Sequence, residues 1–395
     1  MALQVFSPGR LAGLTLRNRV IKTATFEGMC PGGAVSDALI EHHREIAAGG
    51  AGMTTVAYCS VSPEGRTYGH QMLMREEILP DLRRLTEAVH GEGGAAALQL
   101  GHCGNFASKK VIGCKPLAPS RVFNLYGMSF PRAMNASDMD RVAGDFARAA
   151  SLAREAGFDA VELHYGHGYL ISQFLSPYTN RRKDEHGGSL ENRLRFPLDV
   201  LRRVREAMGP EFPVLIKMNL SDGFRRGLQL RESVEVARAL EAGGATALVL
   251  SGGFVSKTPL YMMRGNVPVR EMVKVQDRWF RRVGLALFGR IFVQTYPFEE
   301  LFFLDESRQV REAVGLPLVL IGGILSRAGL ERAMEEGFDF VALGRALIHD
   351  PEFLHKLEAG AVERSECDQC NRCIAEMDAG GVRCPCADEA EGEVG

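Results

Sequence analysis

Two histidines and a tyrosine lie close together in the segment VELHYGHGYLI, which spans residues 161–171. Two imidazoles can donate hydrogen bonds to one carbonyl oxygen, and a phenol can transfer a proton. His164, His167 and Tyr169 are therefore the first candidates for catalysis. The His-x-x-His spacing also fits a pair of metal ligands, or a loop histidine bonded to the backbone. The residues alone leave these three roles open.

An apolar run leads into this segment, and the same arrangement recurs along the chain. Helical patterns end in glycine, as at Gly157 and Gly337, and a short apolar run follows at once. Glycine accepts the positive φ of a helix C-terminus, and short strands that are apolar on both faces are typical of parallel sheets covered by helices. Such strands are expected to begin near Val20, Met53, Ala95, Ala160, Val214, Ala247, Leu318 and Phe340.

Eight alternating strand and helix units predict an α/β fold, the (β/α)8 TIM barrel. In this barrel the reactive residues lie at the carboxyl ends of the strands, where residues 164–169 fall. The clearest helix is expected over residues 138–156, with Val142 and Phe146 on its apolar face. A doubly wound open sheet is the competing fold, but the chain has no GxGxxG fingerprint of a dinucleotide-binding sheet.

Three stretches are longer than a minimal barrel requires. Residues 101–137 are expected to form a long loop or hairpin over the barrel mouth, and residues 252–298 a lid or binding loop. We expect one barrel domain over residues 1–360 and a Cys-rich tail over residues 361–395. The acidic end of that tail, EAEGEVG, is expected to be disordered.

Composition limits the partners. The 395 residues include 47 Lys and Arg against 49 Asp and Glu, so the chain has no bulk attraction to nucleic acid or anionic lipid. The sequence does not open on a secretory signal pattern, and no apolar run approaches the about 20 residues that span a bilayer. We expect a cytoplasmic protein that binds a small molecule, without nucleic acid or membrane partners. The sequence is compatible with a homo-oligomer.

The stretch HYGHGYLISQFLSPYTNRRKDEHGGSLENRLRF resembles the signature of the Old Yellow Enzyme family, the NADH:flavin oxidoreductases that include FMN-dependent ene-reductases. Further matches follow in strand order, and the resemblance covers roughly residues 3–355. These matches are NRV with Thr25, LQLGH, IKM, IGGI and LGRAL. The resemblance implies a TIM barrel flavoprotein that holds FMN and takes hydride from NADH or NADPH by ping-pong kinetics.

The resemblance also implies a flavin site at the strand ends. Ala24, Thr25 and Tyr58 would lie against the flavin, and Gln99 would bond to its pyrimidine edge. Lys217 would stabilise the negative charge of reduced flavin, at a position where many relatives have Arg.

The phosphate of FMN is expected after the seventh and eighth strands. Backbone N–H groups of Gly323 and Gly344 would approach it, and Arg345 would add a charge-assisted bond. The phosphate would therefore be bound by backbone N–H groups and one guanidinium.

In the implied reaction, His164 and His167 polarise the activating carbonyl of an α,β-unsaturated substrate, and Tyr169 protonates its α-carbon. Phe26 and Glu27 are expected to line the substrate pocket. Relatives often have Thr or Cys near the position of Phe26, where the side chain can bond to the flavin O4, so flavin tuning is expected to differ here.

The tail carries a possible ligand set for an iron–sulfur cluster or Zn, namely Cys367, Cys370, Cys373 and Cys384. Relatives that reduce dienoyl thioesters hold a cluster at this place, but their spacing differs by one residue. The alternative is that the cysteines stay reduced and free of metal, and we expect the tail to be dispensable for flavin chemistry.

Two further functions fit the same residues. The chain could be a subunit or relative of the dienoyl-thioester reductase and amine dehydrogenase branch, with an iron–sulfur centre. It could also be a flavin-free barrel lyase that uses Lys217 as a Schiff base.

Overall fold

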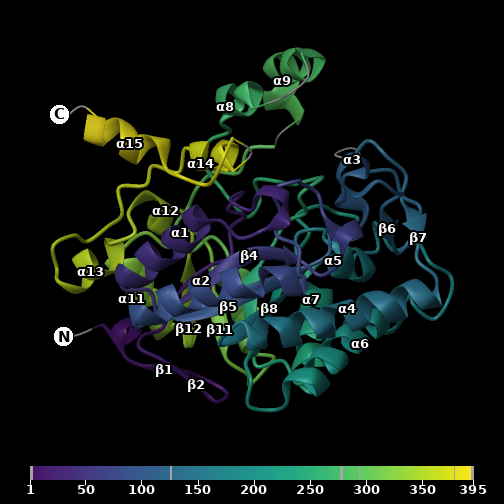
Figure 1. The fold of residues 1–395 in the computed structure, drawn as a ribbon, viewed down its shortest axis with the longest axis horizontal. Helices are drawn as coiled ribbons and strands as arrows, with labels where there is room; N and C mark the ends of the chain where they lie inside the picture. The colour runs from purple at the N-terminus through teal and green to yellow at the C-terminus, as the bar shows by residue number, and fades with distance from the viewer. Residues whose placement is uncertain (1–2, 125–126, 276–278, 293, 378, 393–395) are drawn as a thin grey trace.

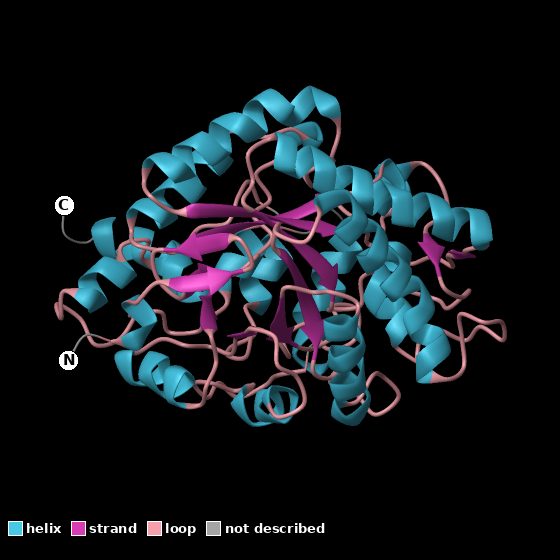
Figure 2. Cartoon of the chain, turned by 90° about the horizontal axis from the view of Figure 1, so that it is seen from below, coloured by secondary structure: helices cyan, strands magenta, loops and turns pink. Residues whose placement is uncertain are grey.

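Eight parallel strands close into a barrel at the centre of the molecule, and helices surround it (Figures 1 and 2). The computed structural model describes residues 3–124, 127–275, 279–292, 294–377 and 379–392. The barrel strands are β3 (Val20–Lys22), β4 (Met53–Ser60), β5 (Ala95–Gly101), β8 (Ala160–Tyr165), β9 (Val214–Asn219), β10 (Ala247–Ser251), β11 (Leu318–Leu320) and β12 (Phe340–Leu343). Each predicted strand is confirmed, with its start at the expected residue.

The outer helices connect one barrel strand to the next, as the alternation predicts, and the last two, α12 and α13, follow the final strand β12. They are α1 (Asp37–Ala48), α2 (Leu79–Gly91), α4 (Ala136–Glu155), α6 (Leu190–Met208), α7 (Leu230–Ala242), α10 (Leu304–Arg311), α11 (Arg327–Glu335), α12 (Arg345–His349) and α13 (Phe353–Glu358). Shorter 3-10 turns cover Gln4–Phe6, Pro31–Gly33, Pro63–Gly65, Glu76–Ile78 and Gly104–Phe106. This arrangement confirms the (β/α)8 barrel.

Strand pairing closes the barrel between the two ends of the sequence. Val20 of β3 lies opposite Val341 of β12, and Lys22 lies opposite Leu343. The remaining strands pair in chain order, so β5 pairs with β8 and β8 with β9. The carboxyl ends of all eight strands therefore face one mouth.

The opposite end of the barrel is plugged by a hairpin. Strands β1 (Gly9–Leu11) and β2 (Leu14–Leu16) pair antiparallel, and Leu11 and Leu16 are fully buried against the barrel interior. Small and branched apolar side chains fill the rest of that interior. Access to the barrel from solvent is thus confined to the mouth at the carboxyl ends.

Helix α4 begins two residues before the predicted start, because Asn135 caps it. The Asn135 side chain accepts a hydrogen bond from the N–H of Asp138, and the Asp138 carboxylate accepts one from the N–H of Asn135. Val142 and Phe146 lie on its buried face, as predicted.

The mouth is covered by segments that the long loops contribute. Residues 101–137 contain α3 (Lys109–Ile112) and two short strands, β6 (Leu117–Ala118) and β7 (Arg132–Ala133). These two strands pair parallel, and Asn124 and Ser129 form an antiparallel bridge between them, so the segment is a long loop with little regular structure. The short helix α5 (Leu170–Leu175) follows β8.

The second long stretch and the tail meet where α8 lies beside α14 (Figure 1). Residues 252–298 fold into α8 (Val269–Lys274) and α9 (Trp279–Phe292), and the tail contains α14 (Arg372–Glu376) and α15 (Pro385–Gly392). Disorder was expected from residue 389, but α15 runs to Gly392; residues 393–395 lie outside the described residues. Within the described ranges, each helix is too short or too polar to span a bilayer.

Candidate functional site

A cavity of about 360 Å³ opens at the carboxyl ends of the barrel strands. Its wall is mainly apolar, with a few polar side chains from the strand ends, as in most cofactor sites. The cavity is lined by every predicted site residue except Glu27: Ala24, Thr25, Phe26, Tyr58, Gln99, His164, His167, Tyr169, Lys217, Gly323, Gly344 and Arg345. The roles given to these residues remain predictions, but the structure brings them to one place.

Glu162, a buried carboxylate that was not predicted from the sequence, contacts two of the polar side chains that line the cavity. Oε1 of Glu162 lies 2.6 Å from Nε2 of Gln99, which donates to it, and 3.0 Å from Nζ of Lys217. Lys217 also donates to Oγ1 of Thr23 at 3.0 Å. Glu162 and His164 are two apart on β8, so strand periodicity places them on one face of the strand. That periodicity was the available signal for Glu162.

His164, His167 and Tyr169 gather at one side of the cavity. The ring centroids of His164 and Tyr169 lie 4.2 Å apart, and those of His164 and His167 lie 5.0 Å apart. The ring of Tyr169 also packs against Tyr58, with centroids 5.0 Å apart. The backbone N–H of Gly166 donates to Nδ1 of His164 at 3.4 Å, which leaves Nε2 of that ring to carry the proton.

Backbone geometry fixes the second imidazole. His167 has a φ of 59°, an αL conformation that few residues other than glycine adopt. Its N–H donates to Oδ1 of Asn219 at 2.9 Å, and its Nε2 lies 2.8 Å from Oγ of Ser251. Asn219 and Ser251, at the ends of β9 and β10, are thus further site residues that the sequence did not predict.

Both imidazoles are neutral over the physiological range of pH. Burial lowers the pKa of His164 well below its ordinary value, and His167 and Lys217 lower it further. Burial, with Lys217, lowers the pKa of His167 to about 3. A neutral imidazole still offers one N–H donor, so these rings can polarise a carbonyl without carrying charge.

The predicted phosphate end combines glycine backbone with one cation. Gly323 has a φ of 71°, and a Cβ there would lie 2.5 Å from the ring of Phe298, so a larger residue would displace that ring. Burial lowers the pKa of the Arg345 guanidinium. Arg345 Nη1 donates to the carbonyl of Arg264 at 2.9 Å and to Oδ1 of Asn371 at 2.5 Å. The sequence did not predict these bonds, which tie the guanidinium to the tail.

These residues fit FMN. Thr25 Oγ1 and Gln369 Oε1 are buried at the cavity without a hydrogen-bond partner among the described residues, which marks positions for polar ligand atoms. Gln99 and Lys217 offer donors to the ring system. Gly323 and Arg345 offer a close backbone approach and a positive charge to the phosphate. The donor set therefore matches a flat ring at one end and an anion at the other.

Replacing Arg345 with alanine should weaken FMN binding by about 1.5–3 kcal/mol, the scale of a hydrogen bond to a charged group. The measurement is FMN titration of the apoprotein. Asn371→Gly is the matched control, because it removes the Arg345–tail bond, keeps the guanidinium, and permits the φ of 61° at that position. An equal loss in both variants would assign the effect to the tail, not to a phosphate contact.

The prediction that Glu27 lines the substrate pocket is wrong, because this residue lies outside the cavity wall. It is 1% exposed, and its Oε1 lies 2.8 Å from Nζ of Lys22 and 3.4 Å from Nε2 of His43. Burial alone would raise the pKa of Glu27, but Lys22 and His43 hold it below its ordinary value. Both carboxylate oxygens also accept from the N–H of Ala57. Glu27 therefore anchors β3 to β4 and α1 behind the site.

The tail contributes to the cavity wall. Gln369, Cys373, Met377 and Val382 line the cavity, and the N–H of Val382 donates to the carbonyl of Glu27 at 2.7 Å. The expectation that the tail is dispensable therefore has no support in this arrangement. Loss of the tail would open one side of the cavity.

The predicted cysteine ligand set is only partly brought together. Among the described residues, one group of three potential ligands has all its ligand atoms within 4.8 Å of one another, and it consists of Asp368, Cys370 and Cys386. Cys370 Sγ lies 3.6 Å from Cys386 Sγ, whereas Cys384 Sγ lies 3.3 Å from Nδ1 of His349. Cys386 was not in the predicted set. An iron–sulfur cluster or Zn on these residues stays a prediction.

The barrel and the cavity define a class of protein, an FMN-binding barrel oxidoreductase of the Old Yellow Enzyme type, and comparisons with known proteins agree. Residues 4–281 match the sequence profile of the NADH:flavin oxidoreductase / NADH oxidase family. The chain is 46% identical over 381 residues to the 4,4'-dithiodibutanoate disulfide reductase of Rhodococcus erythropolis, covering 96% of this chain and 94% of that one.

A second relative is longer. The chain is 33% identical over 371 residues to a metal reductase of Desulforamulus reducens, covering 93% of this chain and 51% of the relative, so it spans about half that length. Among solved structures, morphinone reductase in complex with tetrahydroNAD superposes with a TM-score of 0.71 at 26% identity, covering 93% of each chain.

The chain therefore belongs to the NADH:flavin oxidoreductase / NADH oxidase family. It is an oxidoreductase that uses FMN, with NADH or NADPH as the reductant.

Proposed function

We propose that this enzyme passes hydride from NADH or NADPH to the activated C=C bond of an α,β-unsaturated carbonyl compound or a related electrophile. One observation carries the proposal: two neutral imidazoles and a phenol converge on one side of an apolar cavity, within ring-contact distance of one another. This set can bind a carbonyl oxygen and deliver a proton without placing a charge in the cavity.

FMN, when bound, accepts hydride from the nicotinamide and supplies it to the acceptor. The protein binds and orients the acceptor. The N–H donors of His164 and His167 hold the carbonyl oxygen and stabilise the negative charge that develops there as hydride reaches the β-carbon. The Tyr169 hydroxyl gives a proton to the α-carbon, so one hydride and one proton saturate the C=C bond. Because the nicotinamide and the acceptor use the same cavity, they bind in turn, which predicts ping-pong kinetics.

Reduction of a small disulfide is the second candidate, and the 46% identity with a disulfide reductase over nearly the whole chain favours it. Hydride transfer to one sulfur would break the S–S bond and release the other sulfur as a thiolate. The imidazole N–H donors would stabilise that thiolate, and one proton would complete two thiols. The same residues therefore serve either acceptor.

A Schiff-base lyase and an iron–sulfur enzyme have less support. Lys217 is held by Glu162 and Thr23, and the chain belongs to a flavin-dependent family, so nothing observed favours a lyase. An iron–sulfur branch would rest on the tail cysteines, which stay untested as ligands. The natural partner of the site is a small-molecule electrophile, and a homo-oligomer stays a proposal.

Anaerobic acceptor measurements test the proposal. The holoenzyme is reduced with one equivalent of NADPH and mixed with cyclohexenone, cyclohexene or 4,4'-dithiodibutanoate while flavin absorbance is recorded. We expect rapid reoxidation by cyclohexenone and none by cyclohexene, which lacks the carbonyl that the imidazoles bind. Reoxidation by the disulfide but not by cyclohexenone or other enones would replace the first candidate with the second.

A further inference from the structure

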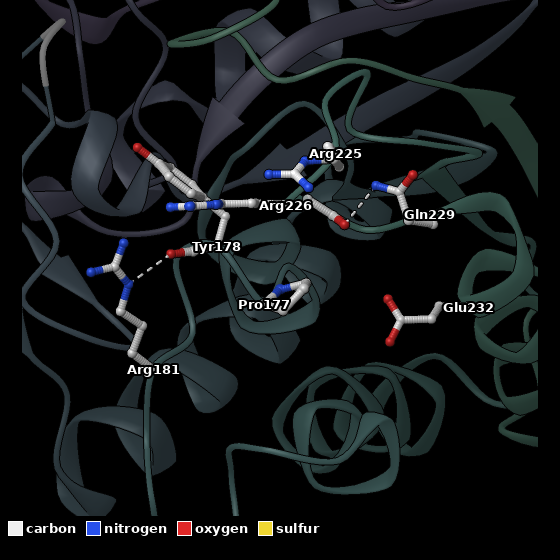
Figure 3. A pocket seen from close by; sticks show the side chains of 8 residues that line it. Pro177, Tyr178, Arg181, Arg225, Arg226, Gln229 and Glu232 are labelled. Carbon is white, nitrogen blue, oxygen red and sulfur yellow. Dashed lines mark hydrogen bonds between the residues drawn. The ribbon is translucent and has the colours of Figure 1, made fainter.

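Two hollows beside the cavity form a continuous basic surface. The first is lined by Tyr178, Arg181, Arg225 and Arg226, among others (Figure 3). The second shares Tyr178 and Arg181 and adds Arg121 and Lys257, with the aromatic rings of Phe123 and Phe130. We call these residues together the basic groove: Arg121, Phe123, Phe130, Tyr178, Arg181, Arg225, Arg226 and Lys257.

The cations of the groove are not neutralised by the protein. No ion pair found among the described residues involves Arg121, Arg181, Arg225, Arg226 or Lys257. Glu232 lines the first hollow, but its carboxylate is paired with Arg193 of α6. Five positive groups on one face without carboxylate partners create a local positive potential, although the net charge of the chain is −2.

Aromatic rings lie against three of these cations, Arg121, Arg181 and Lys257. Lys257 Nζ lies 5.0 Å from the centroid of the Tyr178 ring, and Arg181 Cζ lies 5.8 Å from it. Arg121 Cζ lies 5.3 Å from the ring centroid of Phe130, which is 51% exposed. Such stacking orients a cation without using its hydrogen-bond donors, although Nε of Arg181 also donates to the carbonyl of Tyr178 at 3.2 Å. The groove thus combines available donors with exposed aromatic surface.

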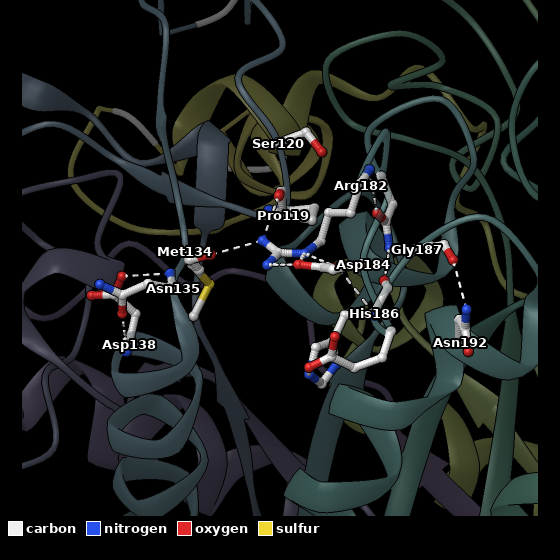
Figure 4. A network of polar contacts seen from close by, with 12 residues as sticks. Pro119, Ser120, Met134, Asn135, Asp138, Arg182, Asp184, His186, Gly187 and Asn192 are labelled. Carbon is white, nitrogen blue, oxygen red and sulfur yellow. Dashed lines mark hydrogen bonds and ion pairs between the residues drawn. The ribbon is translucent and has the colours of Figure 1, made fainter.

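A polar network holds the segment before Arg121 against the segment that carries Arg181 (Figure 4). Arg182 Nη1 donates to the carbonyls of Pro119 and Met134, at 3.0 and 2.7 Å, and its guanidinium pairs with Asp184. The N–H of Arg181 donates to Oγ of Ser120 at 2.8 Å. Arg121 is the residue after Ser120, which is bonded to Arg181. These hydrogen bonds therefore position Arg121 and Arg181 in the protein without a ligand.

The basic groove adjoins the cavity, because consecutive residues of two segments line one and then the other. Phe106 and Val255 line the cavity, and their neighbours Asn105 and Ser256 line the second hollow. The N–H of Val255 donates to the carbonyl of His167 at 3.0 Å, which joins this wall to the reacting end of the site. A ligand whose reactive ring occupies the cavity can therefore extend into the groove.

We propose that the basic groove binds the phosphate-bearing adenosine half of the nicotinamide dinucleotide. This proposal rests on the proposed function, because it places the nicotinamide in the cavity. The chain has no glycine-rich dinucleotide fingerprint, so the phosphates must be met by side chains. Arginine forks bind phosphate oxygens in pairs, and Phe123 and Phe130 offer faces to the adenine ring.

The test compares the double variant R225A/R226A with the matched double variant R202A/R238A. Arg202 and Arg238 pair with acidic residues on α6 and α7 and do not line the groove. Each double variant loses two positive charges, so the comparison between them removes the long-range electrostatic effect of net charge on NADPH binding. We expect the dissociation constant of NADPH, taken from the concentration dependence of anaerobic flavin reduction, to rise about tenfold or more in R225A/R226A only. The limiting rate of reduction should not change.

Two further measurements keep the outcome specific. N-benzyl-1,4-dihydronicotinamide carries no phosphate, so it should reduce both variants as it reduces the parent, within about twofold. Calorimetry with ADP on the oxidised holoenzyme should show binding in the parent and in R202A/R238A but not in R225A/R226A. The calorimetry needs no turnover, and neither experiment needs an acceptor, so both stay informative if the proposed acceptor chemistry fails.

Three results would overturn the proposal. The first is an unchanged NADPH dissociation constant in R225A/R226A, and the second is an equal loss with the phosphate-free donor. The third is an effect confined to reoxidation by an anionic acceptor such as 4,4'-dithiodibutanoate, with cyclohexenone unaffected. That third result would show that the groove receives a carboxylate of the acceptor and not a phosphate of the dinucleotide.

Discussion

Tyr169→Phe should leave reduction of the flavin by NADPH nearly unchanged and slow reoxidation by an enone about 10²–10⁴-fold, the usual scale for a positioned general acid. Hydride transfer from nicotinamide needs no proton from the phenol, whereas saturation of the alkene needs one at the α-carbon. The ring of Tyr169 packs against Tyr58 and His164, and phenylalanine keeps those contacts. Stopped-flow absorbance separates the two half-reactions.

A quinone is the control acceptor, since its reduction does not need protonation at carbon, and it should reoxidise the variant at close to the parent rate. Enone reoxidation at the parent rate would show that water or another residue donates the proton. Failure of both half-reactions while FMN stays bound would assign Tyr169 to the nicotinamide site instead.

Glu162→Leu should lower the free energy of unfolding by about 3–5 kcal/mol, because it leaves a buried ammonium without its carboxylate. Lys217 is 1% exposed, and Glu162 is 2% exposed. The same change should impair FMN binding, since Oε1 of Glu162 also orients Gln99. Chemical denaturation of the apoprotein gives the first quantity, and flavin titration gives the second.

The double variant E162L/K217M is the control for that prediction. Replacing both charges with apolar groups should restore most of the lost stability, because no buried charge is left unpaired. FMN binding should stay impaired, since the double variant also lacks the cation expected beside the flavin. A double variant as unstable as E162L would show that the packing of Glu162, and not its charge, stabilises the barrel.

The barrel could be predicted because its signals are local. Strands β4, β8, β10 and β12 are short apolar runs that come soon after a helix ending next to glycine, and this local pattern places the strand starts without any knowledge of pairing. The start of α4 was missed by two residues because the capping role of Asn135 depends on its contact with Asp138. The disorder expected for EAEGEVG rested on composition alone, and α15 extends into that segment.

The site was predicted where a residue lies at a strand end, and missed where its role depends on a distant partner. Strand periodicity puts Glu162 on the same face as His164, but its contact with Lys217 across the β8–β9 pairing is not visible in any local pattern. Glu27 follows Phe26 in sequence, but its carboxylate is bound by Lys22 of β3 and lies 3.4 Å from His43 of α1, outside the cavity wall. The bond from Arg345 to the tail depends on how residues 361–392 cross the mouth, which composition could not reveal.

Closure between β3 and β12 has a consequence for how the enzyme matures. Val20 cannot pair with Val341 until some 320 residues of intervening chain have been made, and Gln369, Cys373 and Val382 of the cavity wall are made later still. Pairings of such long sequence separation form slowly. During synthesis the nascent chain would therefore expose an open sheet without a flavin pocket, and FMN capture would be a late, post-translational step. The yield of active enzyme would then depend both on chaperones that protect the open sheet and on the supply of FMN.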